Sequence, residues 1–134
     1  MLKVWQVAVL ALLGAALWGL VTYGIHARTG APVDKDLLRT LLVAPIVGWI
    51  SVGLCKLVGR LSAEQILPGV TVVGAVAMLM DGVALRWFSG LYGFDEKLLR
   101  LSAADLLWGY GVGFAAALVW VWVGLARRKV QPSG

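Results

Sequence analysis

Long apolar runs separated by short polar stretches form the main pattern of this sequence. A helix that crosses a bilayer needs about 20 mostly apolar residues, and four runs have that length. The pattern therefore predicts an all-α integral membrane bundle of four transmembrane helices with short loops, in a single membrane domain over residues 1–134. The four predicted spans cover residues 4–25, 37–58, 66–88 and 106–126.

Two of the runs carry features that refine this prediction. The first follows Lys3 and is longer than the 7–15 apolar residues typical of a signal peptide core, so we expect an uncleaved helix, with a cleaved signal peptide as the alternative. The second contains Pro45, which has no backbone N–H and clashes with the carbonyl group of Leu41. We therefore expect a kink in this helix at Pro45.

Two similar segments precede the third and fourth runs. Residues 60–65 read Arg-Leu-Ser-Ala-Glu-Gln, and residues 100–105 read Arg-Leu-Ser-Ala-Ala-Asp. In each segment the serine is expected to cap the helix that follows, with Gln65 or Asp105 reaching back to it. The similarity fits either a relic of an inverted duplication or the independent use of one capping pattern.

Composition excludes several classes of protein. Hydrophobic residues make up 60% of the chain and charged residues 14%, with a mean hydropathy of +0.87. Soluble chains average about 45–50% apolar residues and about 25% charged residues. The single cysteine and single histidine exclude a disulfide scaffold and a Cys/His zinc site. Although the net charge is +5, the basic residues are scattered, so we expect no nucleic-acid partner. Since no nucleophile–base pair or metal-ligand spacing stands out, we also expect no enzymatic activity, no cofactor and no metal.

Basic residues near the ends of the spans and in the loops bear on orientation. Their number is equal on the two sides of the membrane. The compact run of Arg127, Arg128 and Lys129 favours a cytoplasmic C-terminus because basic residues close to a span stay on the cytoplasmic side. With an even number of spans, both termini are predicted in the cytoplasm.

Small residues mark the helix faces that are expected to pack. In lipid, helices associate where small side chains let their backbones approach closely. One small-residue stripe is predicted in the first span and another in the fourth, and Gly74 shares a face of the third span with Asp81. The stripes consist of Ala11, Ala15 and Gly19, and of Gly109, Gly113 and Ala117.

Asp81 is the most unusual residue of the predicted spans. A charge at the centre of a membrane helix costs at least about 2.5–3.5 kcal/mol, so its side chain is expected to face other helices. It lies near the end of the third span, where Trp87 and Tyr92 are expected in the interfacial aromatic belt; Trp18, in the first span, is expected to pack against helices or lipid. Four further polar residues are predicted at the same end of the bundle: Arg39, Asp105, Arg86 and His26.

This cluster allows two interpretations. Asp81 is either the centre of a proton, cation or solute site, as acids inside membranes generally suggest, or it is a structural partner of Arg39 or Arg86. Arg86 lies five positions from Asp81, a poor spacing for one helical face, so Arg39 is the better partner.

Residues 78–85, Met-Leu-Met-Asp-Gly-Val-Ala-Leu, are followed by Trp87-Phe88, Leu91-Tyr92-Gly93 and Leu107-Trp108-Gly109. Together they resemble a family of small uncharacterised bacterial proteins with four predicted membrane spans. The resemblance covers the second half of the chain, and the first half only in hydropathy. It implies a bacterial inner-membrane location and four spans.

The expected role is that of a small accessory or scaffolding subunit, which self-associates as a homo-oligomer or joins a larger membrane protein complex within the lipid bilayer. Four helices with short loops leave little interior, and the small-residue faces exceed what contacts within one chain require. The alternative is a small transporter or channel that uses Asp81, and a membrane enzyme is a third possibility.

Overall fold

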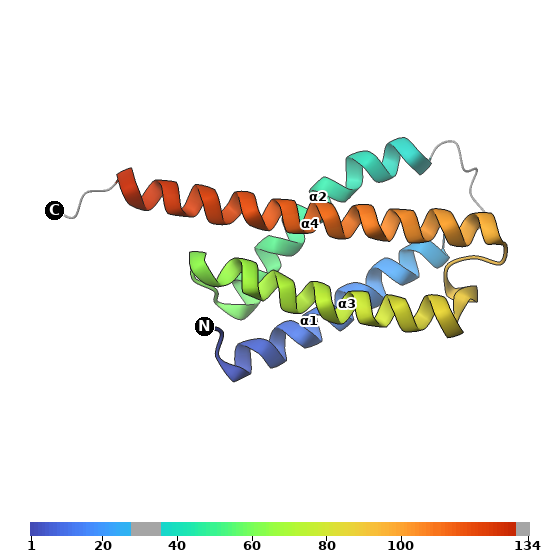
Figure 1. Cartoon of the computed structure of the whole chain (residues 1–134), viewed down its shortest axis with the longest axis horizontal. Coiled ribbons are helices and arrows are strands. Elements are labelled where there is room, and N and C mark those ends of the chain that lie inside the picture. Colours follow the sequence, from blue (N-terminus) through green and yellow to red (C-terminus); the bar gives the residue numbers. More distant parts are fainter. Residues whose placement is uncertain (28–35, 131–134) are drawn as a thin grey trace.

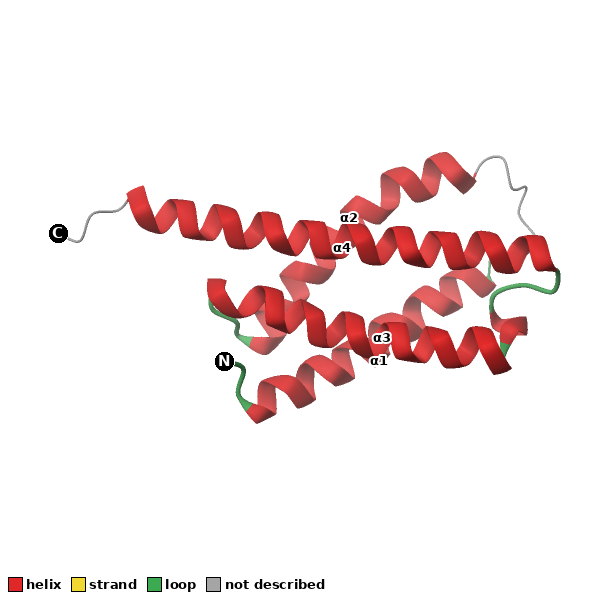
Figure 2. Cartoon of the chain, in the orientation of Figure 1, coloured by secondary structure: helices red, strands yellow, loops and turns green. Residues whose placement is uncertain are grey.

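The computed structural model describes residues 1–27 and 36–130, and the side chains of residues 1–27 and 42–127. All regular elements within these residues are helical (Figure 2). The single turns of 3-10 helix lie on either side of α3. The elements in chain order are α1 (Val4–His26), α2 (Asp36–Gly59), η2 (Ala63–Gln65), α3 (Ile66–Trp87), η3 (Ser89–Leu91) and α4 (Glu96–Val130).

Each of the four long helices contains a stretch that is long and apolar enough to cross a membrane. The predicted all-α bundle of four membrane-length helices is confirmed, and the chain is a multi-pass membrane protein. The α2 helix includes Pro45, and the kink expected there stays a prediction. The four stretches are Val4–His26, Leu42–Gly59, Ala63–Trp87 and Glu96–Arg127.

The helices pack as two main pairs. The α1 helix packs mainly against α3, and α2 packs mainly against α4, with further contacts between α3 and α4. In Figure 1, α3 and α4 run side by side in front of α1 and α2. Behind them, the start of α2 and the end of α1 lie apart at the end of the bundle that carries the α3–α4 connection (Figure 1). The bundle is therefore closed on the α3–α4 side and splayed between α1 and α2.

The α1 helix approaches α3 closely at Gly14. A Cβ atom at this position would lie 2.7 Å from the carbonyl oxygen of Val73, so only glycine fits there. The predicted stripe lies one position away: Ala11 and Ala15 are half-buried, and a Cβ at Gly19 would meet nothing within 4 Å. Adjacent helical positions point about 100° apart, and this rotation moves the contact from the stripe to Gly14.

The α4 helix contacts its neighbours through part of the second predicted stripe. Gly74 of α3 faces the Phe114 ring, since a Cβ there would lie 2.8 Å from the ring's Cζ atom. A Cβ at Gly48 of α2 would lie 3.4 Å from the Cα atom of Gly113, and Ala117 is fully buried. A Cβ at Gly109, by contrast, would meet nothing within 4 Å, so this glycine borders open space.

The corner between α2 and α3 is closed by a left-handed residue and by a side chain from α1. Arg60 has a φ of 48°, and the N–H of Leu61 donates to the carbonyl of Lys56 at 3.0 Å, the pattern of a Schellman cap. The carbonyl of Gly59 accepts a 2.8 Å hydrogen bond from the buried amide Nε2 of Gln6. The beginning of α1 thus satisfies the end of α2.

The start of α4 differs from the predicted one. The helix begins at Glu96, and the carboxylate of Asp95 caps it by accepting the N–H of Leu98 at 2.8 Å. Ser102 therefore lies within the helix, where its Oγ donates to the carbonyl oxygen of Tyr92 at 2.9 Å. The cap predicted at Ser102 is wrong, because Asp95, an equally good capping residue, lies earlier in the chain and caps the helix there.

The similar segment before α3 does lie at a helix start. Gln65 accepts the backbone N–H of Ser62 through Oε1 at 3.1 Å, which is the reach-back that the capping pattern predicts. The two similar segments therefore have different structural roles, one before a helix and one inside a helix.

Candidate functional site

Asp81 is buried inside the bundle with only 4% of its surface exposed. It lies on the face of α3 that also buries Gly74 and Ala77. The expectation that Asp81 faces other helices and not lipid is therefore confirmed. The shared face follows from the spacing, since positions four and seven apart lie on one side of a helix.

Three neutral donors hold the Asp81 carboxylate. The indole Nε1 of Trp18 on α1 donates to Oδ1 at 2.9 Å. The hydroxyl of Tyr92, in the α3–α4 connection, donates to the same oxygen, and the hydroxyl of Tyr110 on α4 donates to Oδ2. A carboxylate accepts hydrogen bonds only, so these indole and phenol groups match its chemistry. Within the described residues, its hydrogen-bond partners are all uncharged.

A second set of contacts positions Tyr92. Its hydroxyl oxygen lies 3.2 Å from Nε1 of Trp18 and 3.3 Å from Oγ1 of Thr22, which is buried one turn further along α1. Tyr92 lies between the membrane-spanning segments and is 1% exposed. Burial, followed by the hydrogen bond to Asp81, raises the pKa of the Tyr92 phenol above its ordinary value. The phenol is thus held in its protonated, donating form.

A cavity of about 390 Å³ lies beside this carboxylate and is lined by all four helices. Trp18, Asp81 and Tyr110 form one part of its wall, and Asp105 contributes a second carboxyl group. Most of the remaining wall is aliphatic. Examples are Leu17 and Val21 of α1, Val47 and Val52 of α2, and Val73 of α3.

The cavity is open between α1 and α2 in the described part of the chain. Leu20 and Val21 on α1 line it and are 68% and 40% exposed, and Val43 and Val47 on α2 line it and are 39% and 43% exposed. These residues belong to the two helices that diverge in Figure 1. The four residues lie within the membrane-length stretches of α1 and α2. In a membrane, an opening between these two apolar helices therefore faces lipid acyl chains.

The structure brings together only part of the predicted polar cluster. Asp105 is half-buried and lines the same cavity as Asp81. Arg86 and His26 are exposed and do not line it. Arg39 belongs to α2, but its side chain lies outside the described residues, so the predicted pair with Asp81 stays a prediction.

Sequence reasoning missed the donors of the site. Trp18 was expected to pack against helices or lipid, and Tyr92 was expected in the interfacial belt; instead both hydrogen-bond to Asp81. One usable signal was the spacing of Trp18 and Thr22, which places two polar groups on one face of an otherwise apolar helix. Tyr110, which sits among apolar residues of α4, offered a similar signal.

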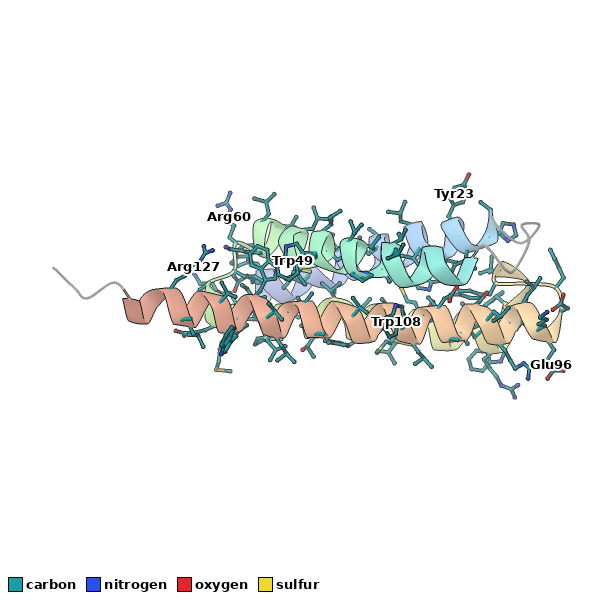
Figure 3. The ribbon with its side chains drawn as sticks, turned by 90° about the horizontal axis from the view of Figure 1, so that it is seen from above. Tyr23, Trp49, Arg60, Glu96, Trp108 and Arg127 are labelled. Atoms are coloured by element: carbon teal, nitrogen blue, oxygen red, sulfur yellow. The ribbon has the colours of Figure 1, made fainter. Side chains whose placement is uncertain are left out.

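Charged side chains lie at both ends of the bundle. Arg60 and Arg127 lie at the end that carries the C-terminal half of α4, whereas Tyr23 and Glu96 lie at the opposite end (Figure 3). At the first of these ends, the ammonium group of Lys56 lies 5.1 Å from the centroid of the Trp120 ring, a cation–π distance.

Among the described residues, no three His, Cys, Asp or Glu side chains are grouped so that they could hold a metal ion. Comparison of the chain with protein-family models, curated proteins and solved structures finds no match. The chemistry of the Asp81 cavity is therefore the basis of the functional proposal.

Proposed function

We propose that this protein is a small membrane transporter or channel that binds a cation at Asp81. The observation that carries the proposal is the position of this carboxylate, buried within the membrane bundle and on the wall of a cavity of about 390 Å³. Ionisable residues at such positions mark ion or substrate pathways because their burial is otherwise costly.

The partners of Asp81 favour binding over a purely structural role. A buried carboxylate whose only role is to hold helices together is expected to form an ion pair with a buried cation. The donors that we find on Asp81, from Trp18, Tyr92 and Tyr110, are neutral, so they stabilise the carboxylate without cancelling its charge. Asp105 adds a second acidic group to the wall of the same cavity. A cation in the cavity would balance the charge of Asp81.

The test is uptake into liposomes that contain the purified full chain. Labelled Na⁺, K⁺, methylammonium and benzyltrimethylammonium serve as probes. We expect protein-dependent uptake of at least one probe and a loss of about tenfold or more in Asp81→Asn. Asp95→Asn is the matched control, since Asp95 caps α4 away from the cavity and asparagine caps about as well. Equal uptake by wild type and Asp81→Asn for every probe would reject the proposal.

A second proposal is the role as an accessory or scaffolding subunit. It is favoured by Gly19 on α1, where an added Cβ would meet nothing within the chain, so the backbone is open to a close approach by another helix. If this face carries an assembly, Gly19→Leu should lower the particle mass in mild detergent while the helical content remains unchanged.

For the membrane, we propose the bacterial inner membrane with both termini in the cytoplasm. The family resemblance supports the location, and the basic run of Arg127, Arg128 and Lys129 supports the orientation.

A further inference from the structure

We propose that the cation bound at Asp81 is an amphipathic organic one: a tertiary or quaternary ammonium group attached to an apolar body. This inference rests on the proposed function and specifies its ligand. It excludes a bare inorganic cation as the main ligand, and it assigns separate parts of the cavity to the charged and apolar parts of the ligand.

The cavity suits an apolar body. A volume of about 390 Å³ lies within the range of about 300–1,000 Å³ found for small-molecule sites. The wall is largely aliphatic, with residues such as Leu17, Val52 and Val73. Aliphatic walls supply no ligands to a small metal ion, and they would strip a hydrated ion of water without replacing it. They do favour the burial of apolar groups.

The acidic end suits a charge that donates few or no hydrogen bonds. A carboxylate has about four acceptor positions, and Trp18, Tyr92 and Tyr110 use three of those on Asp81. Divalent cations such as Ca²⁺ and Mg²⁺ take about six to eight oxygen ligands, far more than the one acceptor position that remains on Asp81. A quaternary ammonium group needs only the negative charge and neighbouring aromatic rings.

The aromatic rings are present at the same place. The side chains of Trp18 and Tyr110 both line the cavity beside Asp81. Aromatic rings around a carboxylate are a chemically suitable environment for an alkylammonium group, because the ring faces attract cations and tolerate apolar substituents.

The opening between α1 and α2 suits a ligand that dissolves in the bilayer. Leu20 and Val43 line the cavity and remain exposed on the two sides of this gap. An amphipathic cation concentrates in membranes through its apolar body, whereas an inorganic ion does not. The geometry thus gives an amphipathic ligand a route from the acyl-chain region to Asp81.

The experiment compares a cation with its uncharged isostere in the full chain in lipid nanodiscs. The probes are labelled benzyltrimethylammonium and neopentylbenzene, in which carbon replaces the charged nitrogen. Binding per protein is measured after subtracting the uptake by empty nanodiscs. We expect saturable binding of the cation. The isostere should bind at least about tenfold more weakly, because the Asp81 carboxylate attracts a positive charge.

Two glycine variants locate the bound probe. Gly109 lines the cavity, and Gly111 does not; at both, an added Cβ would meet nothing within 4 Å. Gly109→Leu should fill the cavity without displacing a helix and weaken cation binding at least about tenfold. Gly111→Leu should bind like wild type and serves as the matched control. Asp81→Asn should weaken binding to a similar extent as Gly109→Leu.

The outcomes separate the ligand class from the proposed function. Absence of saturable benzyltrimethylammonium binding, or equal binding by wild type and Gly109→Leu, overturns the ligand assignment. If Na⁺, K⁺ or methylammonium still shows Asp81-dependent uptake, the transport proposal stands without this ligand assignment. If benzyltrimethylammonium binds in an Asp81- and Gly109-dependent way but no probe is taken up, the ligand assignment stands and the transport proposal fails.

Discussion

The indole Nε1 of Trp18 lies 2.9 Å from the Oδ1 oxygen of Asp81, a contact that joins α1 to α3 across 63 positions of sequence. The same two helices meet at Gly14 and Val73, further along the pair. The polar site therefore lies on the same helix pair as the tight contact at Gly14. Positioning the carboxylate and packing the helices are linked properties of this chain.

Removal of one donor should destabilise the protein measurably. Tyr110→Phe deletes the hydroxyl that donates to Oδ2 of Asp81, and hydrogen bonds to charged groups contribute about 1.5–3 kcal/mol. We expect the free energy of unfolding to fall by that amount in a denaturant titration in mild detergent. Tyr23→Phe is the control, since Tyr23 is 73% exposed. Equal losses in the two variants would show that the Tyr110 hydroxyl has no special role.

Alkaline pH should weaken the fold through Tyr92. Its pKa is raised above the ordinary value of 10.0, by burial first and then by Asp81. The folded state therefore keeps a proton that the unfolded state releases above pH 10, so this stabilisation is complete below pH 10 and declines as the pH rises further. The decline in unfolding free energy above pH 10 should be shallower in Tyr92→Phe than in wild type or Tyr23→Phe. An unchanged slope would contradict the assignment.

The α1–α3 contact should tolerate no side chain at Gly14. A methyl group there would lie 2.7 Å from the carbonyl oxygen of Val73, and overpacking of this kind costs about 1–3 kcal/mol. Gly14→Ala should lower thermal stability. Gly53→Ala is the matched control: its methyl group meets nothing within 4 Å, and alanine favours helix over glycine by up to about 1 kcal/mol. If both variants unfold alike, the helices are packed differently.

Hydropathy alone was sufficient to predict the fold, because each span must bury its backbone hydrogen bonds within one apolar helix. Helix rotation was harder to predict. Seventeen glycines give most faces a small residue, so the predicted stripe through Gly19 and the observed contact at Gly14 were both plausible from spacing. The start of α4 was missed because Asp95 and Ser102 are both good caps, and the earlier one forms the cap.

The importance of Asp81 could be predicted from the cost of burying charge, but its partners could not. Sequence reasoning paired an acid with a base, whereas the described partners are an indole and two phenols. Tryptophan and tyrosine are so common at membrane interfaces that their position in the sequence does not distinguish an interfacial ring from a buried donor. Only the packing of α1 and α4 around α3 makes that distinction.

Orientation can be tested with a reporter that is active only outside the cytoplasm. Fused after Gly134, it should be silent, because Arg127 and its basic neighbours favour the cytoplasmic side. Fused after Phe94, an 82% exposed residue in the α3–α4 connection, the same reporter should be active. The reverse pattern of activities would invert the proposed topology.

The negative charge of Asp81 is proposed to bind a cationic ligand and not to stabilise the fold. Asparagine at this position keeps an Oδ1 acceptor for Trp18 and Tyr92, and its amide can donate to the Tyr110 hydroxyl. The loss of a buried charge removes a desolvation cost that offsets the weaker neutral hydrogen bonds. The variant should therefore fold normally.

The most direct measurement is the unfolding free energy of Asp81→Asn in mild detergent, relative to wild type. We expect a value within about 1 kcal/mol of wild type, or above it, because the partners of Asp81 within the described residues are uncharged and their loss strands no cation. A loss of about 3–5 kcal/mol, the cost of breaking a buried ion pair, that is largely recovered by adding Arg39→Gln would contradict the claim and make Asp81 a structural partner of Arg39.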